Sequence, residues 1–309
     1  MSDNKDAVRA ALQNLPEFAG VAGDQDFTAT RLGGLTNLVY RVDMAGRKVI
    51  VRIPGAGTDA YIDRKVELHN ARTAARAGVS PRVLWADAQT GVMIADCLDP
   101  VTTMTPDLFA STDGAVARAG AALAALHGCG QDFQFRFELF AMIDEYLTIL
   151  ADKQAELPPG YHDIVAAAEP VRAALDANPV PLAPCHNDPL CENFLDQGDK
   201  MWIVDWEYSG MNDPMWDLGD LSVEGGFTAA QDTALLHAYF GRAPSAAEQG
   251  RVVIYKAMCD LLWTLWGLIQ HADQNPAEDF WAYSIGRFER CKTLMNSPGF
   301  AAHVAAING

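Results

Sequence analysis

Three polar residues that could do chemistry follow one another in the segment from 185 to 218. Asn193 comes five residues after Asp188, and Asp205 follows the apolar run MWIV. Together they offer a carboxylate that could lie beside a hydroxyl group and two oxygen ligands for a hard cation such as Mg²⁺. Phosphoryl transfer needs little more from a protein than positioning and charge neutralisation. The alternative is that these residues only cap loops as Asx turns.

A glycine pair further upstream could hold phosphates. LGGLTN occupies residues 32–37, between two predicted strands. Gly33 and Gly34 would let backbone N–H groups approach a phosphate chain, and Thr36 and Asn37 could add side-chain donors. An ordinary hairpin turn would show the same pattern, so the motif is informative only together with the charged residues downstream of it.

An arginine lies on the strand that comes next. Arg52 stands between Val51 and Ile53, and its guanidinium fork would suit phosphate oxygens. Glu67, in the following helix, is a natural partner that would hold Arg52 in place. The alternative is two unrelated surface charges.

The elements that must position these residues predict an α+β fold with two lobes. Residues 1–97 are expected to form a small N-lobe with an antiparallel sheet and one helix. Residues 98–309 are expected to form a larger, mainly helical C-lobe. The expected N-lobe elements are a helix at 1–22, strands from Phe27 that include Val39, Val42, Val49, Val51 and Ile53, a helix at 60–78 with Ile62, Val66 and Leu68 on its apolar side, and two strands within 79–98. The expected C-lobe elements are helices at 114–128, 138–155, 161–177, 228–240, 245–272 and 276–295, and short β pieces at 193–195 and 201–205.

Composition argues against a nucleic-acid-binding protein, a disulfide-bonded protein and a membrane protein. The 309 residues carry a formal net charge of -17, which argues against a general nucleic-acid binder. The six cysteines form no CxxC pair, so we expect reduced thiols and a cytoplasmic protein. A zinc site built from Cys185, His186 and Cys191 is the alternative. The N-terminus has no apolar signal region, and the most apolar run, 257–270, is too short to span a bilayer.

The ordered motifs resemble the choline/ethanolamine kinase branch of the kinase-like fold, which is related to the aminoglycoside phosphotransferases. The resemblance covers nearly the whole chain and is carried by GGLTN, VRIPG, DRKVE, CHNDPLCENFL, IVDWEYSG, DLGDLSVE and LLWTLWGLIQ. It implies a two-lobed, protein-kinase-like fold, in which the N-lobe at residues 1–97 binds the nucleotide and the C-lobe at residues 98–309 carries the catalytic loop and the acceptor-binding helices. It also implies ATP and Mg²⁺ as cofactors. It also implies that adenine lies against the connector near residues 95–98.

The resemblance also implies a role for each motif residue. Asp188 would orient the acceptor alcohol and accept its proton, while Asn193 and Asp205 would hold magnesium. Arg52 would take the place of the strand lysine of protein kinases and pair with Glu67. The loop from Gly33 to Asn37 would cover the nucleotide phosphates.

The acceptor is indicated by two tryptophans on one helix face. Trp263 and Trp266 are three residues apart, and core packing is the default explanation for such a pair. A quaternary ammonium, however, is recognised by aromatic faces and carboxylates. In the family this W-x-x-W helix lines the choline pocket, and Glu207 and Glu224 match nearby acidic positions.

One segment departs from the family pattern. Eukaryotic choline kinases carry tyrosines where this chain has Met211, Asn212 and Asp213, so Tyr208 or Trp216 would have to complete the aromatic box.

We therefore expect a cytoplasmic kinase that phosphorylates choline, without nucleic-acid or membrane partners. The enzymatic alternatives are kinases for ethanolamine, thiamine or an aminoglycoside. The non-enzymatic alternative is a quaternary-ammonium binder on a kinase scaffold. His127 and His186 are expected to be structural.

Overall fold

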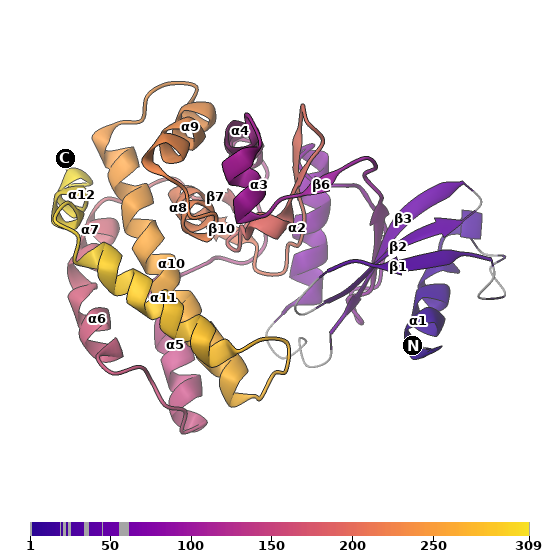
Figure 1. Ribbon diagram of the computed structural model, residues 1–309, viewed down its shortest axis with the longest axis horizontal. Coiled ribbons are helices and arrows are strands. Elements are labelled where there is room, and N and C mark those ends of the chain that lie inside the picture. Colours follow the sequence, from indigo (N-terminus) through magenta and orange to yellow (C-terminus); the bar gives the residue numbers. More distant parts are fainter. Residues whose placement is uncertain are drawn as a thin grey trace.

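The computed structural model describes residues 2–18, 20, 23, 26–33, 37–44, 46–55 and 62–308. It consists of two lobes that lie side by side along the long axis of the molecule (Figure 1). One lobe is built around a sheet, and the other is almost entirely helical. The predicted α+β, two-lobed architecture is confirmed.

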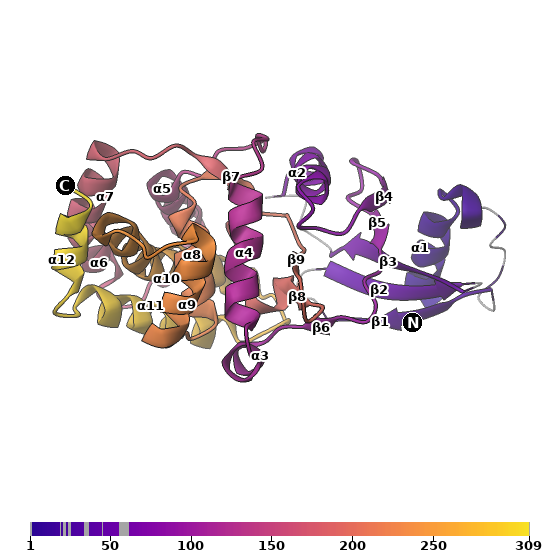
Figure 2. The ribbon, with the colours of Figure 1, turned by 90° about the horizontal axis from the view of Figure 1, so that it is seen from above.

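The N-lobe sheet has five antiparallel strands in the order β1-β2-β3-β5-β4. Strict alternation buries Tyr40, Val42, Val49 and Val51 on one face, together with Ile94 from the fourth strand in that order. Helix α1 lies across this face, as Figures 1 and 2 show. The strand bounds are β1 Thr28–Arg31, β2 Asn37–Met44, β3 Arg47–Pro54, β4 Val83–Ala86 and β5 Met93–Asp96, and α1 spans Ser2–Leu12.

The opposite face of the sheet carries Arg52. Arg52 is the cross-strand partner of Val39, and residues paired in this way point to the same side. Val39 is a strand residue, as predicted, and lies on the side of Arg52, opposite the buried core residues.

Helix α2 (Arg64–Arg76) lies between the sheet and the helical lobe (Figure 2). Its N-cap is Asp63, whose side chain accepts hydrogen bonds from the backbone N–H groups of Lys65 and Val66. The buried side of the helix begins with polar residues, Arg64, Glu67 and Asn70. The predicted apolar side through Val66 and Leu68 was therefore wrong, because this helix packs its polar side toward the other lobe.

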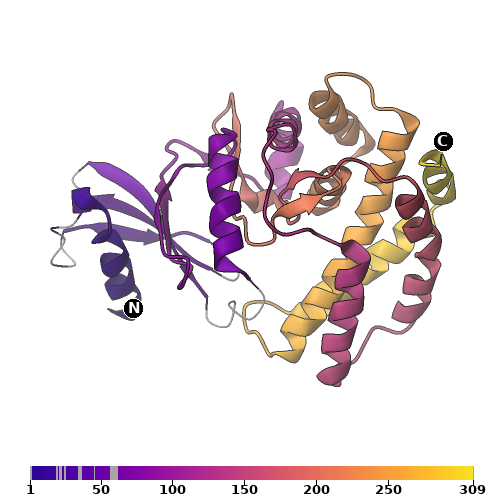
Figure 3. The same ribbon diagram turned by 180° about the vertical axis from the view of Figure 1, so that it is seen from behind.

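The C-lobe surrounds one long helix, α10, which Figure 3 shows from behind. The predicted single helix at 161–177 is two helices, α6 and α7, and the sequence did not indicate α3, α8 or α12. The helices are α3 Pro106–Ser111, α4 Ala115–His127, α5 Leu139–Asp152, α6 Tyr161–Ala167, α7 Glu169–Ala177, α8 Met215–Glu224, α9 Ala229–Phe240, α10 Ala246–Ala272, α11 Phe280–Met295 and α12 Phe300–Ala306.

Helix α10 is long and apolar enough to cross a membrane by length and composition. It extends well beyond the run 257–270, so length does not exclude a membrane span as the sequence had suggested. Most of its apolar window, 78%, is buried inside the structure. That burial is what a core helix of a helical lobe requires.

Two small ladders hold the segment from 185 to 218 in the C-lobe. Strand β8 (Phe194–Asp196) pairs with β9 (Met201–Ile203) and β6 (Thr102–Thr103). Strand β7 (Ala183–Cys185) pairs with β10 (Gly210–Asn212). Each ladder ends next to a polar residue of the predicted site.

Helices α8 and α10 approach each other closely at Gly219. A Cβ atom there would lie 2.8 Å from the carbonyl oxygen of Val252 and 2.9 Å from the Cβ of Tyr255. We expect Gly219→Ala to lower the free energy of unfolding by about 1–3 kcal/mol, because the helices must separate. Urea denaturation measures this change.

Gly286 in α11 is the matched control, because a Cβ there meets nothing within 4 Å. Gly286→Ala should leave stability unchanged or raise it by about 0.5–1 kcal/mol through helix propensity. Equal stability of Gly219→Ala and the wild type would contradict the close packing of α8 on α10.

Candidate active site

The side chain of Asp217 fixes the loop that carries Asp188 through hydrogen bonds to the loop backbone. This fully buried carboxylate on α8 accepts hydrogen bonds from the backbone N–H of His186 at 2.7 Å and of Asn187 at 2.8 Å. It also contacts the imidazole Nε2 of His127 at 2.9 Å. Each oxygen of Asp217 is thus committed to the backbone immediately before Asp188.

Asn187 adopts a strained backbone conformation that its side chain stabilises. Its φ angle is +68°, which is uncommon for a residue other than glycine. Its amide group donates to the carbonyl of Tyr208 at 3.0 Å and accepts from Asn212 at 3.0 Å, and its own carbonyl accepts from Trp216 at 3.0 Å. Such over-determined strain is typical of functional loops.

Asp188 is left without a partner for its carboxylate among the described residues. Burial, followed by the charge of Glu224, raises the pKa of Asp188 to about 7. The amide nitrogen of Asn193 donates to the backbone carbonyl of Asp188 at 3.0 Å, which leaves the amide oxygen of Asn193 available as a ligand. A carboxylate with such a pKa is suited to accept a proton near neutral pH.

The ladder of β8 and β9 brings Asp205 next to Asn193. The backbone N–H of Val204 donates to the carbonyl of Asn193 at 3.0 Å, and Asp205 follows with a φ of +69°. Its Oδ1 atom is buried without a hydrogen-bond partner among the described residues. Burial and the charge of Glu207 raise the pKa of Asp205 to about 8. A bound cation would satisfy this oxygen, so Asn193 and Asp205 fit a magnesium site.

Two arginines from the N-lobe meet three carboxylates at this point. Arg52 pairs with Glu67, as predicted, and lies 3.5 Å from Asp205. Arg64 contacts Glu67 at 3.0 Å and Glu207 at 2.6 Å. We refer to these five residues as the inter-lobe ion network. Glu207, which the resemblance assigned to the acceptor site, therefore lies among the arginines of this network.

Arg64 was not identified from the sequence. Its spacing of three residues from Glu67 was the available signal, but that spacing is common in helices and carries little information alone.

The predicted phosphate loop is described only at its two ends. Gly34 and Thr36 lie outside the described residues, while the carbonyl of Gly33 accepts a hydrogen bond from Arg31 at 3.1 Å. Asn37 is only 2% exposed, and neither polar atom of its amide has a partner among the described residues. A buried, unpaired amide at this position is suited to contact a ligand.

An aromatic cluster lies beside the catalytic loop. The rings of Trp263 and Tyr208 are 5.4 Å apart, and the indole N–H of Trp266 donates to the hydroxyl of Tyr208 at 2.9 Å. Phe280 and Tyr283 of α11 stand 5.6 and 5.9 Å from Trp266. Sequence reasoning missed the two α11 residues, because nothing local shows that α11 packs on α10 at this point.

Of the two residues suggested to complete the aromatic box, Tyr208 belongs to this cluster and Trp216 does not. Trp216 is fully buried and packs against Phe137 and Tyr255. It fixes the catalytic loop through its hydrogen bond to Asn187.

Two acidic residues of α8 lie next to the aromatic cluster. Glu224 pairs with Arg287 at 2.5 Å, and Arg287 also lies over the ring of Tyr283 at 4.6 Å. Asp220 accepts a hydrogen bond from the indole N–H of Trp263 at 3.2 Å. The predicted Glu224 is therefore close to the cluster, although its charge is already balanced.

His127 and His186 make structural contacts, as predicted. His127 bridges Asp217 and the hydroxyl of Tyr239 at 2.9 Å each. The ring of His186 contacts the carbonyl of Val204 at 2.8 Å, and burial lowers its pKa. Within the described ranges the groups with metal-ligand geometry are His127 with Cys185 and Asp217, and Glu67 with Asp205 and Glu207. The zinc alternative with Cys191 is thus not assembled.

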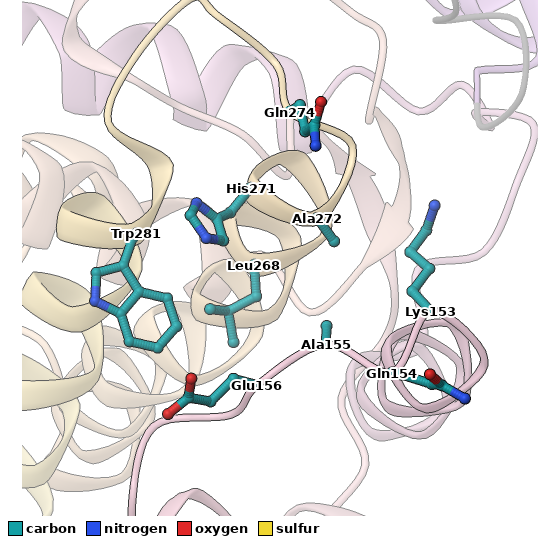
Figure 4. Close-up of a pocket in the computed structure, with 9 residues that line it drawn as sticks. All are labelled: Lys153, Gln154, Ala155, Glu156, Leu268, His271, Ala272, Gln274 and Trp281. Atoms are coloured by element: carbon teal, nitrogen blue, oxygen red, sulfur yellow. The ribbon is translucent and has the colours of Figure 1, made fainter.

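A cavity of about 700 Å³ lies elsewhere, between α5, the end of α10 and the start of α11 (Figure 4). Leu268, His271 and Trp281 line it. Leu268 is two residues beyond Trp266 and so points to the other side of α10. None of the predicted site residues lines this cavity.

Comparison with known families defines the class of the protein. The model of the phosphotransferase enzyme family matches residues 28–249, which is well over half of the chain. The match includes Arg52, the catalytic loop and Asp205. The chain therefore belongs to the phosphotransferase enzyme family.

Comparison with individual proteins assigns the chain to a narrower family within the phosphotransferases. The crystal structure of a choline/ethanolamine kinase family protein from Mesorhizobium loti is 58% identical, with a TM-score of 0.89 and 98% of each chain covered. Protein LicA from Haemophilus influenzae is 26% identical over 275 residues, covering 85% of this chain and 78% of LicA. Choline kinase LicA from Streptococcus pneumoniae, at 24% identity, shares the fold with a TM-score of 0.79, covering 95% of this chain and 99% of that one. The chain belongs to the choline/ethanolamine kinase family and is an alcohol-acceptor kinase.

The role of Asp217 can be tested by removing its charge. In Asp217→Asn only one oxygen remains, so one backbone N–H of the catalytic loop faces an NH₂ group. We expect kcat to fall about 10- to 100-fold through misplacement of Asp188. Steady-state kinetics with a parallel unfolding curve measures the effect.

Asp273→Asn is the control, because Asp273 is an exposed carboxylate whose partner is Lys153. It should keep the wild-type kcat. A folded Asp217→Asn protein with the wild-type kcat would show that the loop does not depend on this carboxylate.

Proposed function

We propose that the protein is a choline kinase, which transfers the γ-phosphate of ATP to the choline hydroxyl. The observation that carries this proposal is the aromatic cluster of Tyr208, Trp263, Trp266 and Tyr283 beside the catalytic loop. A quaternary ammonium has no N–H to donate and is bound by aromatic faces. Because Asn187 donates to the Tyr208 carbonyl, the cluster is tied to the residue next to Asp188.

In this proposal, different residues of the C-lobe accept the proton, hold the metal ion and orient the arginines. Asp188 orients the choline hydroxyl and accepts its proton as the oxygen attacks the γ-phosphorus. Asn193 and Asp205 would hold Mg²⁺, which would neutralise charge on the phosphates. Glu207 orients Arg64, and Glu224 orients Arg287 under the acceptor.

The residues of the N-lobe bind the nucleotide. Arg52, held by Glu67, contacts phosphate oxygens, and the loop from Gly33 through Gly34 and Thr36 to Asn37 covers the phosphates. Adenine lies against the connector at residues 95–98. The site of action is the cytoplasm, in keeping with six cysteines that are all unpaired.

Ethanolamine is the second candidate acceptor, because relatives named ethanolamine kinase also match. Ethanolamine kinase 2 from Mus musculus is 26% identical over 273 residues, covering 78% of this chain and 68% of that protein. It would use the same phosphate machinery. The aromatic cluster favours choline over this smaller, fully hydrated ammonium.

A panel of acceptors tests the proposal. ADP release is coupled to an indicator reaction with choline, ethanolamine, thiamine and an aminoglycoside at equal concentrations. We expect choline to give the highest kcat/KM. Turnover of another acceptor without turnover of choline would contradict the proposal, and absence of turnover with any of them would favour a non-catalytic binder.

Trp266 should contribute to acceptor binding and not to nucleotide binding. We expect Trp266→Ala to raise the KM for choline about tenfold or more, because an aromatic face and the hydrogen bond to Tyr208 are lost. The KM for ATP should change less than about twofold.

Trp281→Ala is the control, since Trp281 lines the separate cavity shown in Figure 4. It removes the same ring from the neighbouring helix and should leave both Michaelis constants unchanged. Equal effects of Trp266→Ala on choline and ATP would show that Trp266 only supports the fold.

A further inference from the structure

Helix α8 presents three carboxylates along one side. Asp217, Asp220 and Glu224 are three and four residues apart, so they share one stripe of the helix. Asp217 is committed to the catalytic loop, and Glu224 is committed to Arg287. Asp220, between them, forms no ion pair with any described residue.

Of the two carboxyl oxygens of Asp220, one has a hydrogen-bond partner among the described residues and the other has none. Its side chain is buried, with 1% of the residue exposed. Its Oδ2 atom accepts from the indole N–H of Trp263, whereas Oδ1 has no hydrogen-bond partner within the described part of the chain. Leaving a buried charged oxygen unpaired is costly, so this atom is suited to a ligand.

The arginines near Asp220 form their ion pairs with other carboxylates. Arg287 pairs with Glu224 at 2.5 Å and with Asp260 at 3.1 Å, and Arg290 pairs with Asp260 at 2.6 Å. Two guanidinium groups thus pair with two carboxylates. Among the described residues, Asp220 has no ion-pair partner, so its carboxyl group is available to pair with a cationic ligand.

Asp220 lies near the aromatic cluster, which would bind the ammonium end of the acceptor, and near Asp188, which would bind its hydroxyl end. Its hydrogen bond fixes Trp263, whose ring packs on Tyr208. Burial, then the charges of Glu224 and Asp188, raise the pKa of Asp220 well above its usual range, so the carboxyl group favours its neutral form without a ligand and a bound cation would favour the carboxylate. Asp188, the residue that meets the hydroxyl, is therefore close enough to interact electrostatically. In an amino alcohol such as choline only two carbons separate the hydroxyl from the ammonium.

We propose that Asp220 is the counter-ion of the acceptor's ammonium group and sets the preference of the site for a cationic acceptor. This inference rests on the proposed function. The aromatic rings provide the shape of the site, and Asp220 provides the charge. The N-methyl groups of choline can contact Oδ1 through polarised C–H groups, and a less methylated ammonium can donate a hydrogen bond to the same atom.

The test compares choline with its neutral isostere dimethylbutanol, in which a carbon replaces the nitrogen. The measured quantity is the ratio of kcat/KM for the two acceptors. We expect the wild type to favour choline strongly, and Asp220→Asn to lower this ratio about tenfold or more. The isosteric amide can still accept from Trp263, so turnover of dimethylbutanol and the KM for ATP should be nearly unchanged.

Asp232→Asn is the matched control. Asp232 contacts the same helix through Ser222 and pairs with Lys256, so this variant makes the same charge change away from the cluster. It should keep the wild-type ratio. If Asp220→Asn fails to fold, Asp220→Ser undergoes the same comparison.

An unchanged ratio in Asp220→Asn, or equal losses for both acceptors, would overturn the proposal. Binding of tetramethylammonium by calorimetry gives a readout that does not depend on turnover. If the wild type does not phosphorylate choline, the proposed function fails, yet a tenfold weaker tetramethylammonium affinity in Asp220→Asn would still support the counter-ion. Unchanged tetramethylammonium affinity would exclude it.

Discussion

The two hydrogen bonds from the catalytic loop to Asp217 are the constraint on which the rest of the site depends. They fix the backbone of His186 and Asn187, the latter with a positive φ angle, directly before Asp188. Helix α8 carries Asp217, and Gly219 seats this helix tightly on α10. Since α10 also carries Trp263 and Trp266, the loop of Asp188 and the aromatic cluster are both held by the packing of α8 on α10. In the proposed function, this packing would place the hydroxyl end of an acceptor at Asp188 when its ammonium end is bound by the aromatic rings.

The inter-lobe ion network joins this frame to the N-lobe. Two guanidinium groups, from Arg52 and Arg64, face the carboxylates of Glu67, Asp205 and Glu207. Counted as full charges, the network carries one net negative charge, which suits the binding of a divalent cation at Asp205. The proposed phosphate and ammonium sites have one feature in common. Each combines arginines held by ion pairs with one buried carboxylate oxygen that has no hydrogen-bond partner among the described residues.

The sequence was sufficient for the lobes, the order of the motifs and the pairing of Arg52 with Glu67, because these follow from local spacing and strand periodicity. It was not sufficient for Arg64, Asp220 or Tyr283. Their importance arises from contacts between helices far apart in the chain, which no periodicity encodes. The same reason explains the polar buried side of α2, where the facing lobe overrides the apolar pattern expected for a helix on a sheet.

We infer that Asp188 accepts the proton of the acceptor alcohol. The most direct measurement is the turnover of Asp188→Asn with choline, followed by phosphorus NMR, together with calorimetric binding of a non-hydrolysable ATP analogue. We expect turnover to fall at least about 100-fold while the nucleotide affinity stays within about twofold of wild type. Turnover within a few-fold of the wild type would contradict the role of Asp188 and the mechanism built on it.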